Sequence, residues 1–173
     1  NRRVLELEPE LGNAIKKSHY FSSENLTHFS NRQEADLIKL SDVQNLLNKV
    51  KPDIVINCAG KVGGILANST QRYEFLTENL KINLNIFEAI RELKNVLVLN
   101  FGSSSIYPKN SQIPIVESSL MTGTLEDTNS PYSLSKIVGI ELGKSLHRDN
   151  LKIINLMPTN LYGPNDNFNP ETS

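Results

Sequence analysis

The stretch DIVINCAG, residues 53–60, is a nearly continuous apolar run that ends at a glycine. A strand exposed on one face alternates apolar and polar residues, whereas a strand covered on both faces shows an unbroken apolar run. Two further runs share this pattern, NVLVLNFG at 95–102 and LKIINLMP at 151–158. The first two runs predict buried strands, and the third predicts a further strand that Pro158 ends.

Helical patterns separate these strands, and a shorter one precedes them. Residues 70–93 and 130–149 place apolar residues near helical spacing, with polar residues between them. Ser41–Val50 predicts a short helix that leads into the first strand, with Ser41 or Asp42 as its N-cap. Because strands that alternate with helices imply right-handed crossovers, the sequence predicts an α/β protein with a doubly wound parallel sheet and helices on both faces.

Three loops follow the predicted strands: CAGKVGG at 58–64, GSSSIYP at 102–108 and PTNLYGP at 158–164. All three are rich in Gly, Ser, Pro or Asn. Ligands of open parallel sheets bind beyond the carboxyl ends of the strands. We therefore expect these loops to meet on one rim of the sheet and to form the ligand site.

The composition is that of an ordinary globular domain. The chain has 173 residues, of which 38% are hydrophobic and 21% are charged, and its formal net charge is −1. Scattered Lys and Arg residues argue against nucleic acid or an anionic membrane as the main partner. A single cysteine, Cys58, excludes an internal disulfide, and the three histidines share no metal-ligand spacing. These features predict a metal-free cytoplasmic protein.

The two ends of the chain predict that it is a fragment. It starts at Asn1 without a methionine and stops in the polar stretch NFNPETS. We expect residues 1–173 to form one domain that is truncated before a C-terminal substrate-binding part.

The segment PYSLSK, residues 131–136, places Tyr132 and Lys136 four apart at the start of a predicted helix, with Ser130 as its N-cap and Pro131 as its first residue. Side chains at i and i+4 share one helix face. An ammonium group and a helix N-terminus both favour the phenolate, so the pKa of Tyr132 is expected to fall below its usual value of about 10. Such a tyrosine can exchange a proton with a carbonyl or an alcohol.

NFGSSSIYPK, residues 100–109, places Ser103 and Ser104 at the end of the neighbouring strand. A hydroxyl group there can hydrogen-bond the same substrate oxygen as charge develops on it. With Tyr132 and Lys136, it suits hydride transfer between a nicotinamide and a carbonyl group. Each feature alone has a plainer explanation, because Tyr-x-x-x-Lys is common and a serine-rich strand end is usually a turn. Their occurrence together, in this order on a parallel-sheet pattern, favours catalysis.

Four stretches closely resemble the GDP-L-fucose synthase family, which belongs to the extended short-chain dehydrogenase/reductases. They are NCAGKVGGILANST (57–70), GSSSIYPK (102–109), ESSLMTGTLEDTNSPYSLSKIVGIEL (117–142) and MPTNLYGPNDNFNP (157–170). The resemblance implies a Rossmann-like fold. It also implies the reduction of GDP-4-keto-6-deoxymannose with NADPH, after epimerisation of the two carbons next to the ketone.

The resemblance also implies roles for individual residues. Ser103 matches the catalytic serine, Tyr132 the proton donor, and Lys136 the lysine that tunes the tyrosine and holds the nicotinamide ribose. Ser104 and Asn160 are expected to line the substrate pocket. The residues expected to contact NADP are Gly12, Arg32, Asp36, Leu37, Ala59, Gly60, Phe101, Gly102, Lys136, Pro158, Asn160 and Leu161.

Arg32 is the residue from which the resemblance implies a preference for NADP over NAD. It matches an arginine suited to the adenosine 2′-phosphate, because a guanidinium group binds phosphate through paired donors. Taken by itself, Arg32 would be read as a solvated surface residue.

Three features depart from the family pattern. Ser105 stands where the family has its epimerase cysteine, and a serine hydroxyl is a much poorer base than a thiol, which ionises near pH ~8.5. The family's epimerase histidine would come just after Ser173. The glycine-rich loop that opens the domain keeps only Gly12, with Glu6 and Pro9 in place of the other two glycines.

These residues leave three functional hypotheses. The main one is NADPH-dependent reduction of a GDP-4-keto-6-deoxy sugar, with or without epimerisation. The alternative, favoured by Ser105, is a reductase without epimerase activity on a related hexose or heptose. A second alternative, favoured by the atypical glycine loop, is a non-catalytic nucleotide-binding or assembly module. The resemblance further implies a homodimer in which the helices at 70–93 and 130–149 pair with a second subunit.

Overall fold

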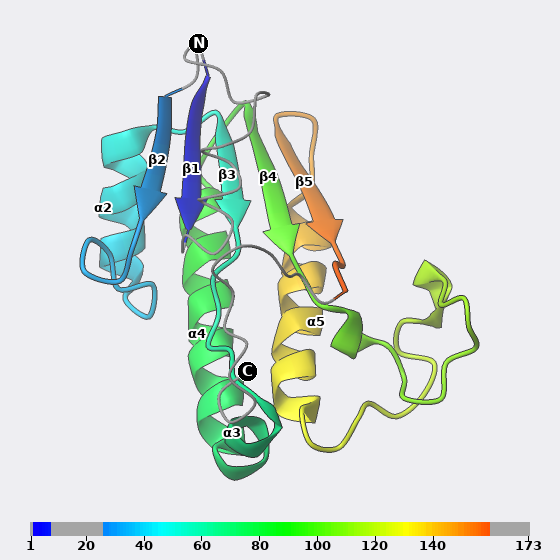
Figure 1. Ribbon diagram of the computed structural model, residues 1–173. Coiled ribbons are helices and arrows are strands. Elements are labelled where there is room, and N and C mark those ends of the chain that lie inside the picture. The colour runs from blue at the N-terminus through cyan, green and yellow to red at the C-terminus, as the bar shows by residue number, and fades with distance from the viewer. Residues whose placement is uncertain (1, 8–25, 160–173) are drawn as a thin grey trace.

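The protein contains one parallel sheet of five strands in the order β2-β1-β3-β4-β5 (Figure 1). The computed structural model describes residues 2–7 and 26–159. The strands are β1 (Arg3–Leu7), β2 (Leu26–Ser30), β3 (Ile54–Asn57), β4 (Val96–Phe101) and β5 (Leu151–Leu156). The chain order reverses between β1 and β3, and such a switch point is where open α/β sheets bind ligands.

The described helices cover one face of this sheet (Figure 1). They are α2 (Leu40–Val50), α3 (Ile65–Thr70), α4 (Arg72–Ile90) and α5 (Ser130–Leu146), with short 3₁₀ turns at η1 (Ser104–Ile106) and η2 (Glu117–Ser119). The Rossmann-like α/β fold is thereby confirmed. Helices on the second face stay a prediction, because the segment between β1 and β2 lies outside the described residues.

The larger of two apolar clusters in the described residues joins the helices to the sheet. Ile86 and Phe87 of α4, Val43 of α2, and Leu5 and Val98 of the sheet are all buried in it. Burying an aliphatic or aromatic side chain of this size stabilises a fold by about 1.5–3 kcal/mol. The core therefore holds the strand ends in a fixed relation to α4 and α5.

The helix predicted at 70–93 is α4 (Arg72–Ile90), and the short helix α3 that precedes it was not predicted. Gln71, with φ −114° and ψ 42°, leaves the helical conformation and separates α3 from α4. The Asn68 side chain donates to the carbonyl groups of Gly63 and Gly64 at 2.6 and 3.1 Å, which ties α3 to the preceding loop. α3 is therefore a short helix attached to the KVGG loop.

The N-caps predicted for α2 are wrong. Its N-cap is Lys39, which makes no side-chain cap bond. Ser41 and Asp42 lie inside the first turn, where the Asp42 carboxylate accepts a 3.2 Å bond from the Asp36 N–H. Asp42 therefore secures the preceding loop rather than the helix end.

The N-cap predicted for α5 is also wrong. Ser130 is the first helical residue, after Asn129 as N-cap. Its hydroxyl group donates to the Asp127 carbonyl at 3.3 Å and accepts from the Arg72 guanidinium at 3.1 Å. Ser130 thus connects the start of α5 to α4.

The structure corrects the assignment of Glu6 to the glycine-rich loop. Glu6 lies inside β1, fully buried, in register with Phe29 of β2 and Ile56 of β3. Because β1 continues through Leu7, Glu6 is a strand residue. Pro9 and Gly12 lie outside the described residues.

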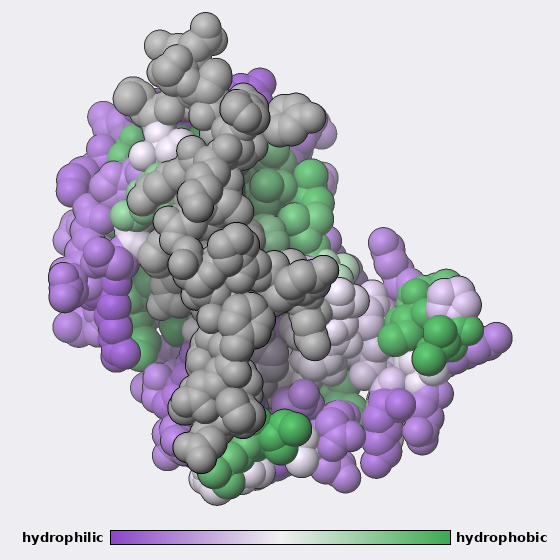
Figure 2. Space-filling view, viewed as in Figure 1, coloured by the Kyte–Doolittle hydropathy of each residue, from purple (hydrophilic) through white to green (hydrophobic). Residues whose placement is uncertain are grey.

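A long connection between β4 and α5 extends away from the sheet (Figure 1), and hydrophobic surface gathers on the part that protrudes (Figure 2). Its apolar residues Ile113, Ile115, Val116 and Met121 are exposed.

Among the described helices, none has the length and apolar character needed to cross a membrane.

Candidate active site

The loops after β4 and β5 meet at the carboxyl edge of the sheet, as predicted. The Gly102 N–H donates to the Leu156 carbonyl at 2.7 Å, and the Ser104 N–H donates to the Pro158 carbonyl at 3.2 Å. A Cβ on Gly102 would lie 3.3 Å from both the Leu156 carbonyl oxygen and the Met157 sulfur, so a side chain would crowd this contact. Close approach of the two loops therefore favours glycine here.

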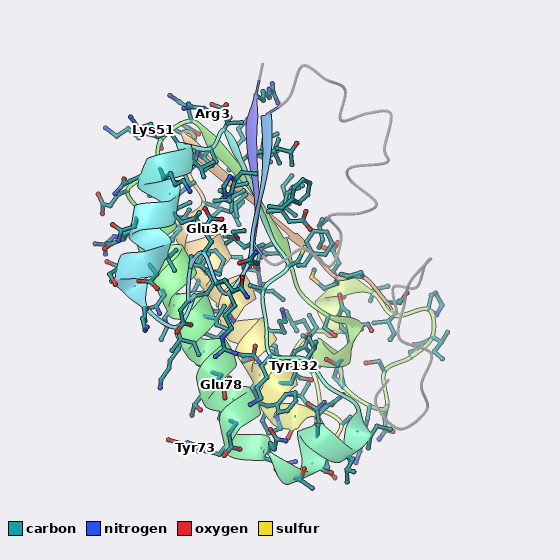
Figure 3. All side chains as sticks on the ribbon, turned by 60° about the vertical axis from the view of Figure 1, so that its left-hand side comes forward. Arg3, Glu34, Lys51, Tyr73, Glu78 and Tyr132 are labelled. Atoms are coloured by element: carbon teal, nitrogen blue, oxygen red, sulfur yellow. The ribbon has the colours of Figure 1, made fainter. Side chains whose placement is uncertain are left out.

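Lys136 lies at the centre of this edge. Its ammonium group donates to the carbonyl groups of Ala59 at 3.3 Å and Phe101 at 3.2 Å, and the residue is only 7% exposed. It lies 5.6 Å from the centroid of the Tyr132 ring, so the i, i+4 spacing brings the two side chains together. Figure 3 shows Tyr132 within the molecule and Tyr73 at its periphery. Two backbone carbonyl groups therefore hold the ammonium group beside the Tyr132 ring.

The serines after β4 form a chain of hydroxyl groups that continues into α5. Ser103 Oγ lies 3.0 Å from Ser105 Oγ and accepts a 3.2 Å bond from the Ser105 N–H. The Ser133 hydroxyl donates to Ser105 Oγ at 2.9 Å. Ser133 is fully buried, and the sequence interpretation missed it, although it directly follows Tyr132. Ser105 therefore lies between the hydroxyl groups of Ser103 and Ser133.

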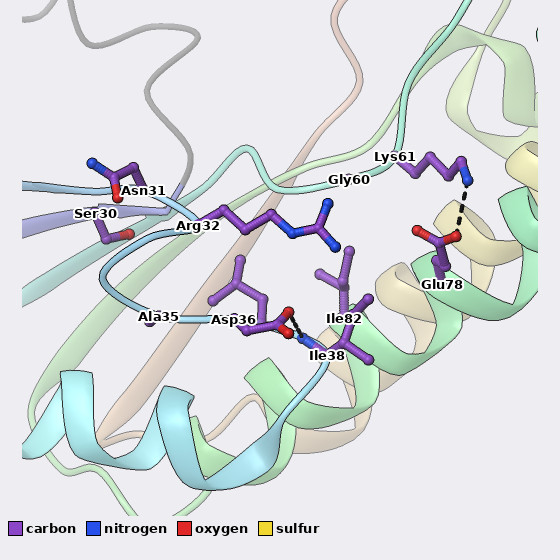
Figure 4. Close-up of a pocket in the computed structure, with 11 residues that line it drawn as sticks. Ser30, Asn31, Arg32, Ala35, Asp36, Ile38, Gly60, Lys61, Glu78 and Ile82 are labelled. Atoms are coloured by element: carbon purple, nitrogen blue, oxygen red, sulfur yellow. Dashed lines mark hydrogen bonds and ion pairs between the residues drawn. The ribbon is translucent and has the colours of Figure 1, made fainter.

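A second part of the site is a cavity of about 200 Å³ beside the loop that follows β2 (Figure 4). Arg32, Asp36, Leu37 and Gly60, all expected to contact the cofactor, line it. The Arg32 side chain extends from its loop over the cavity (Figure 4). The lining residues that were not predicted are Ser30, Asn31, Ala35, Ile38, Lys61, Glu78 and Ile82.

Polar contacts hold the loop that presents Arg32. The Asn31 side-chain oxygen accepts from the N–H groups of Gln33 and Glu34 at 3.0 and 3.1 Å. Glu34 accepts a 2.7 Å bond from Lys49 and lies 2.8 Å from the His28 ring nitrogen. Hydrogen bonds from Lys49 and then His28 lower the pKa of Glu34 below its ordinary value of 4.5.

Glu34→Gln tests this contact through the pH dependence of stability. Because the folded pKa is lowered, the carboxylate contributes stability above pH 4.5 and loses it as pH falls through the folded pKa. We expect the variant to be slightly less stable than wild type near neutral pH and the difference to vanish in acid. The effect is small because the Lys49 side chain is 66% exposed.

Urea unfolding near neutral pH and in acid measures this difference in the free energy of unfolding. Glu92→Gln is the matched control, since it makes the same charge change in an exposed pair with Arg91. An equal stability gap between wild type and Glu34→Gln at both pH values would contradict the assignment.

Three expected site residues cannot be placed. Gly12, Asn160 and Leu161 lie outside the described residues. Within residues 2–7 and 26–159, no group of three or more His, Cys, Asp or Glu side chains could hold a metal ion.

The parallel sheet, its switch point and the cavity at its carboxyl edge define a nucleotide-binding α/β protein of the Rossmann-like class. The chain belongs to the NAD dependent epimerase/dehydratase family, whose model matches residues 2–173.

Two known relatives are similar to this chain over most of its length. The chain is 45% identical over 141 residues to GDP-L-fucose synthase 1 of Arabidopsis thaliana, covering 81% of this chain and 44% of that protein. It is 43% identical over 143 residues to GDP-L-fucose synthase of Escherichia coli K12, covering 82% of this chain and 44% of the relative. The chain thus spans about half the length of the curated relatives it matches.

A similar solved structure is a GDP-6-OMe-4-keto-L-xylo-heptose reductase from Campylobacter jejuni, at a TM-score of 0.86 and 30% identity. The superposition covers 97% of this chain and 49% of that one.

Proposed function

We propose that the chain is the nucleotide-binding part of an oxidoreductase that reduces the keto group of a GDP-linked 4-keto-6-deoxy sugar. The observation that carries the proposal is the position of Lys136. Its ammonium group is held between two strand-end carbonyl groups and beside the Tyr132 ring. Similarity to GDP-L-fucose synthases and to a GDP-keto-heptose reductase supports this substrate class.

The chemistry follows from the side chains present. NADPH, when bound, supplies the hydride that reduces the carbonyl carbon. Tyr132 donates its phenolic proton to the ketone oxygen, and the nearby Lys136 ammonium stabilises the phenolate that this transfer leaves. Ser103 hydrogen-bonds the same oxygen as negative charge develops on it. Ser104, in the same turn, would contact the sugar.

The residues at the switch point fit NADP. Arg32 would pair with the adenosine 2′-phosphate, while Asp36 and Leu37 would lie against the adenine. The support for this assignment is the cavity that these three residues share with Gly60. At the other end, the nicotinamide would bind near Lys136, at the carboxyl ends of the strands. Phe101 ends β4 there, and Ala59, Gly102 and Pro158 lie on the loops that follow the strands.

The geometry around Ser105 favours the reductase without epimerase activity. A base that removes a proton next to a ketone needs a basic atom, and the Ser105 hydroxyl is instead bonded to Ser103 and Ser133. A serine hydroxyl barely ionises at neutral pH, unlike a thiol. We therefore propose reduction without epimerisation as the specific form of the activity.

Turnover in heavy water tests this form. We expect the reduced product of the full-length protein to carry no solvent deuterium on the carbons that flank the former ketone. Mass spectrometry and proton NMR of the product measure this, with substrate incubated without enzyme as the control for spontaneous exchange. Deuterium at those carbons above the control would show that epimerisation occurs despite Ser105.

A homodimer and a cytoplasmic location complete the proposal. α4 and α5 pack against each other and expose apolar side chains, with Tyr73 74%, Leu84 52% and Leu134 48% exposed. A second subunit would remove these side chains from water, at a gain of roughly 25 cal/mol per Å². A monomeric mass in sedimentation equilibrium would contradict the dimer.

A further inference from the structure

Three asparagine side chains form a hydrogen-bonded ladder across the sheet. Asn57 of β3, Asn100 of β4 and Asn155 of β5 occupy matching register positions on adjacent strands. The Asn57 amide donates to Asn100 Oδ1 at 2.9 Å, and the Asn100 amide donates to Asn155 Oδ1 at 2.8 Å. Asn57 and Asn100 are 2% and 3% exposed. This asparagine ladder is a polar network inside an apolar sheet.

The asparagine ladder ends at the groups that hold Lys136. Asn57 Oδ1 accepts a 3.2 Å bond from the Ala59 N–H, and the Ala59 carbonyl accepts from the Lys136 ammonium. The second acceptor of Lys136 is the carbonyl of Phe101, the residue directly after Asn100. Both carbonyl groups therefore lie within two residues of an asparagine of the ladder.

The other end of the ladder lies against α5, the helix that carries Lys136. A Cβ on Gly143 would lie 3.1 Å from Asn155 Oδ1 and 3.1 Å from the Ile153 side chain. Gly143 and Lys136 are seven residues apart, or about two helical turns. The missing side chain at Gly143 leaves space for the Asn155 amide. α5 therefore contacts the ladder at Gly143 and, two turns earlier, contacts the carbonyl groups of Ala59 and Phe101 through Lys136.

Stability alone does not explain this network. Buried amides cost free energy unless every partner is present, and replacing both partners of a buried hydrogen bond by apolar groups of similar shape can be nearly neutral. Leucine has almost the shape of asparagine and would fill the same sites. What an apolar side chain cannot do is accept a hydrogen bond from the Ala59 N–H and so fix the direction of the following turn.

We propose that the asparagine ladder positions the Lys136 ammonium group by fixing the carbonyl groups of Ala59 and Phe101. Asn57, Asn100 and Asn155 are thus positioning residues that act through the backbone. A fully satisfied network of this kind makes a local structure rigid. This inference rests on the proposed function for its catalytic consequence, but the position of the ammonium group can be measured without turnover.

The test uses the full-length protein carrying Asn57→Leu and Asn100→Leu together. The ammonium protons of a buried, hydrogen-bonded lysine exchange slowly with water and give a proton–nitrogen NMR cross-peak, which is assigned to Lys136 by its absence in Lys136→Met. We expect the double variant to fold and its Lys136 cross-peak to disappear. We also expect kcat to fall about tenfold with KM unchanged, within the ~10²-fold that a misplacement of about 1 Å can cost.

Two further variants separate positioning from loss of stability. Ile90→Val removes one methylene from the core away from the ladder, and we expect it to keep the wild-type cross-peak. Asn155→Ala removes only the outermost, partly buried amide, and we expect faster exchange of the Lys136 ammonium protons than in wild type.

The inference is wrong if the Lys136 ammonium protons exchange with water at the wild-type rate both in the Asn57→Leu/Asn100→Leu double variant and in Asn155→Ala. If the wild-type protein shows no ketone reduction, the proposed function fails while the NMR result still decides whether the ladder positions Lys136. If turnover is present and the exchange rates are unchanged, the ladder inference alone fails.

Discussion

Tyr132→Phe is expected to lower kcat for ketone reduction by ~10²–10⁴-fold, the usual contribution of a positioned general acid. The variant keeps the ring beside Lys136 and loses only the hydroxyl group that gives its proton to the ketone oxygen. KM and the affinity for NADPH should change little, because the proton is transferred in the transition state. Steady-state kinetics with the full-length protein measures these constants.

Tyr73→Phe is the matched control for this prediction. It removes the same hydroxyl group from an exposed tyrosine at the N-terminal end of α4 and should leave kcat at the wild-type value. A kcat within a few-fold of wild type for Tyr132→Phe would remove Tyr132 from the mechanism.

Arg32→Ala is expected to weaken NADPH binding by about tenfold to a hundredfold and to leave NADH binding unchanged. Hydrogen bonds to a charged group contribute about 1.5–3 kcal/mol, and about 1.4 kcal/mol corresponds to tenfold in Kd. The selectivity follows because Arg32 would contact only the 2′-phosphate, the group in which the two cofactors differ. Fluorescence titration of the full-length protein with each cofactor gives both constants.

Lys39→Ala is the control for charge. It removes a cation from the same loop, but Lys39 does not line the cavity and pairs with Asp36 at 3.8 Å. Equal weakening of NADPH by Lys39→Ala and Arg32→Ala would indicate a general electrostatic effect. Equal weakening of NADPH and NADH by Arg32→Ala would place Arg32 elsewhere than at the 2′-phosphate.

The sequence predicted the elements that have strong periodicity. The apolar runs correctly identified β3, β4 and β5, and helical spacing identified α2, α4 and α5. It did not identify β1 and β2, because RVLEL contains the buried Glu6 and LTHFS carries no clear pattern. Helix ends were placed less well, since the hydroxyl of Ser130 and the carboxylate of Asp42 bind neighbouring segments that sequence spacing does not reveal.

The residues of the candidate site could also be predicted only in part from the sequence. Tyr132 and Lys136 could be found because one helix sets their relation, so local spacing was sufficient. The asparagine ladder and the Ser133 contact depend on the register between strands and on the packing of α5. Residues 57, 100 and 155 are far apart in the chain, and no local pattern connects them. Tertiary contacts of this kind become visible only in the structure.

The most direct test of the account is turnover itself. Full-length protein is incubated with NADPH and GDP-4-keto-6-deoxymannose, the loss of nicotinamide absorbance is followed, and the product is identified by mass spectrometry. We expect one NADPH to be oxidised for each ketone converted to an alcohol, with Tyr132→Phe nearly inactive in the same assay. Saturable NADPH binding without oxidation, for this substrate and for the related GDP-4-keto heptoses, would contradict it and would instead support a non-catalytic nucleotide-binding module.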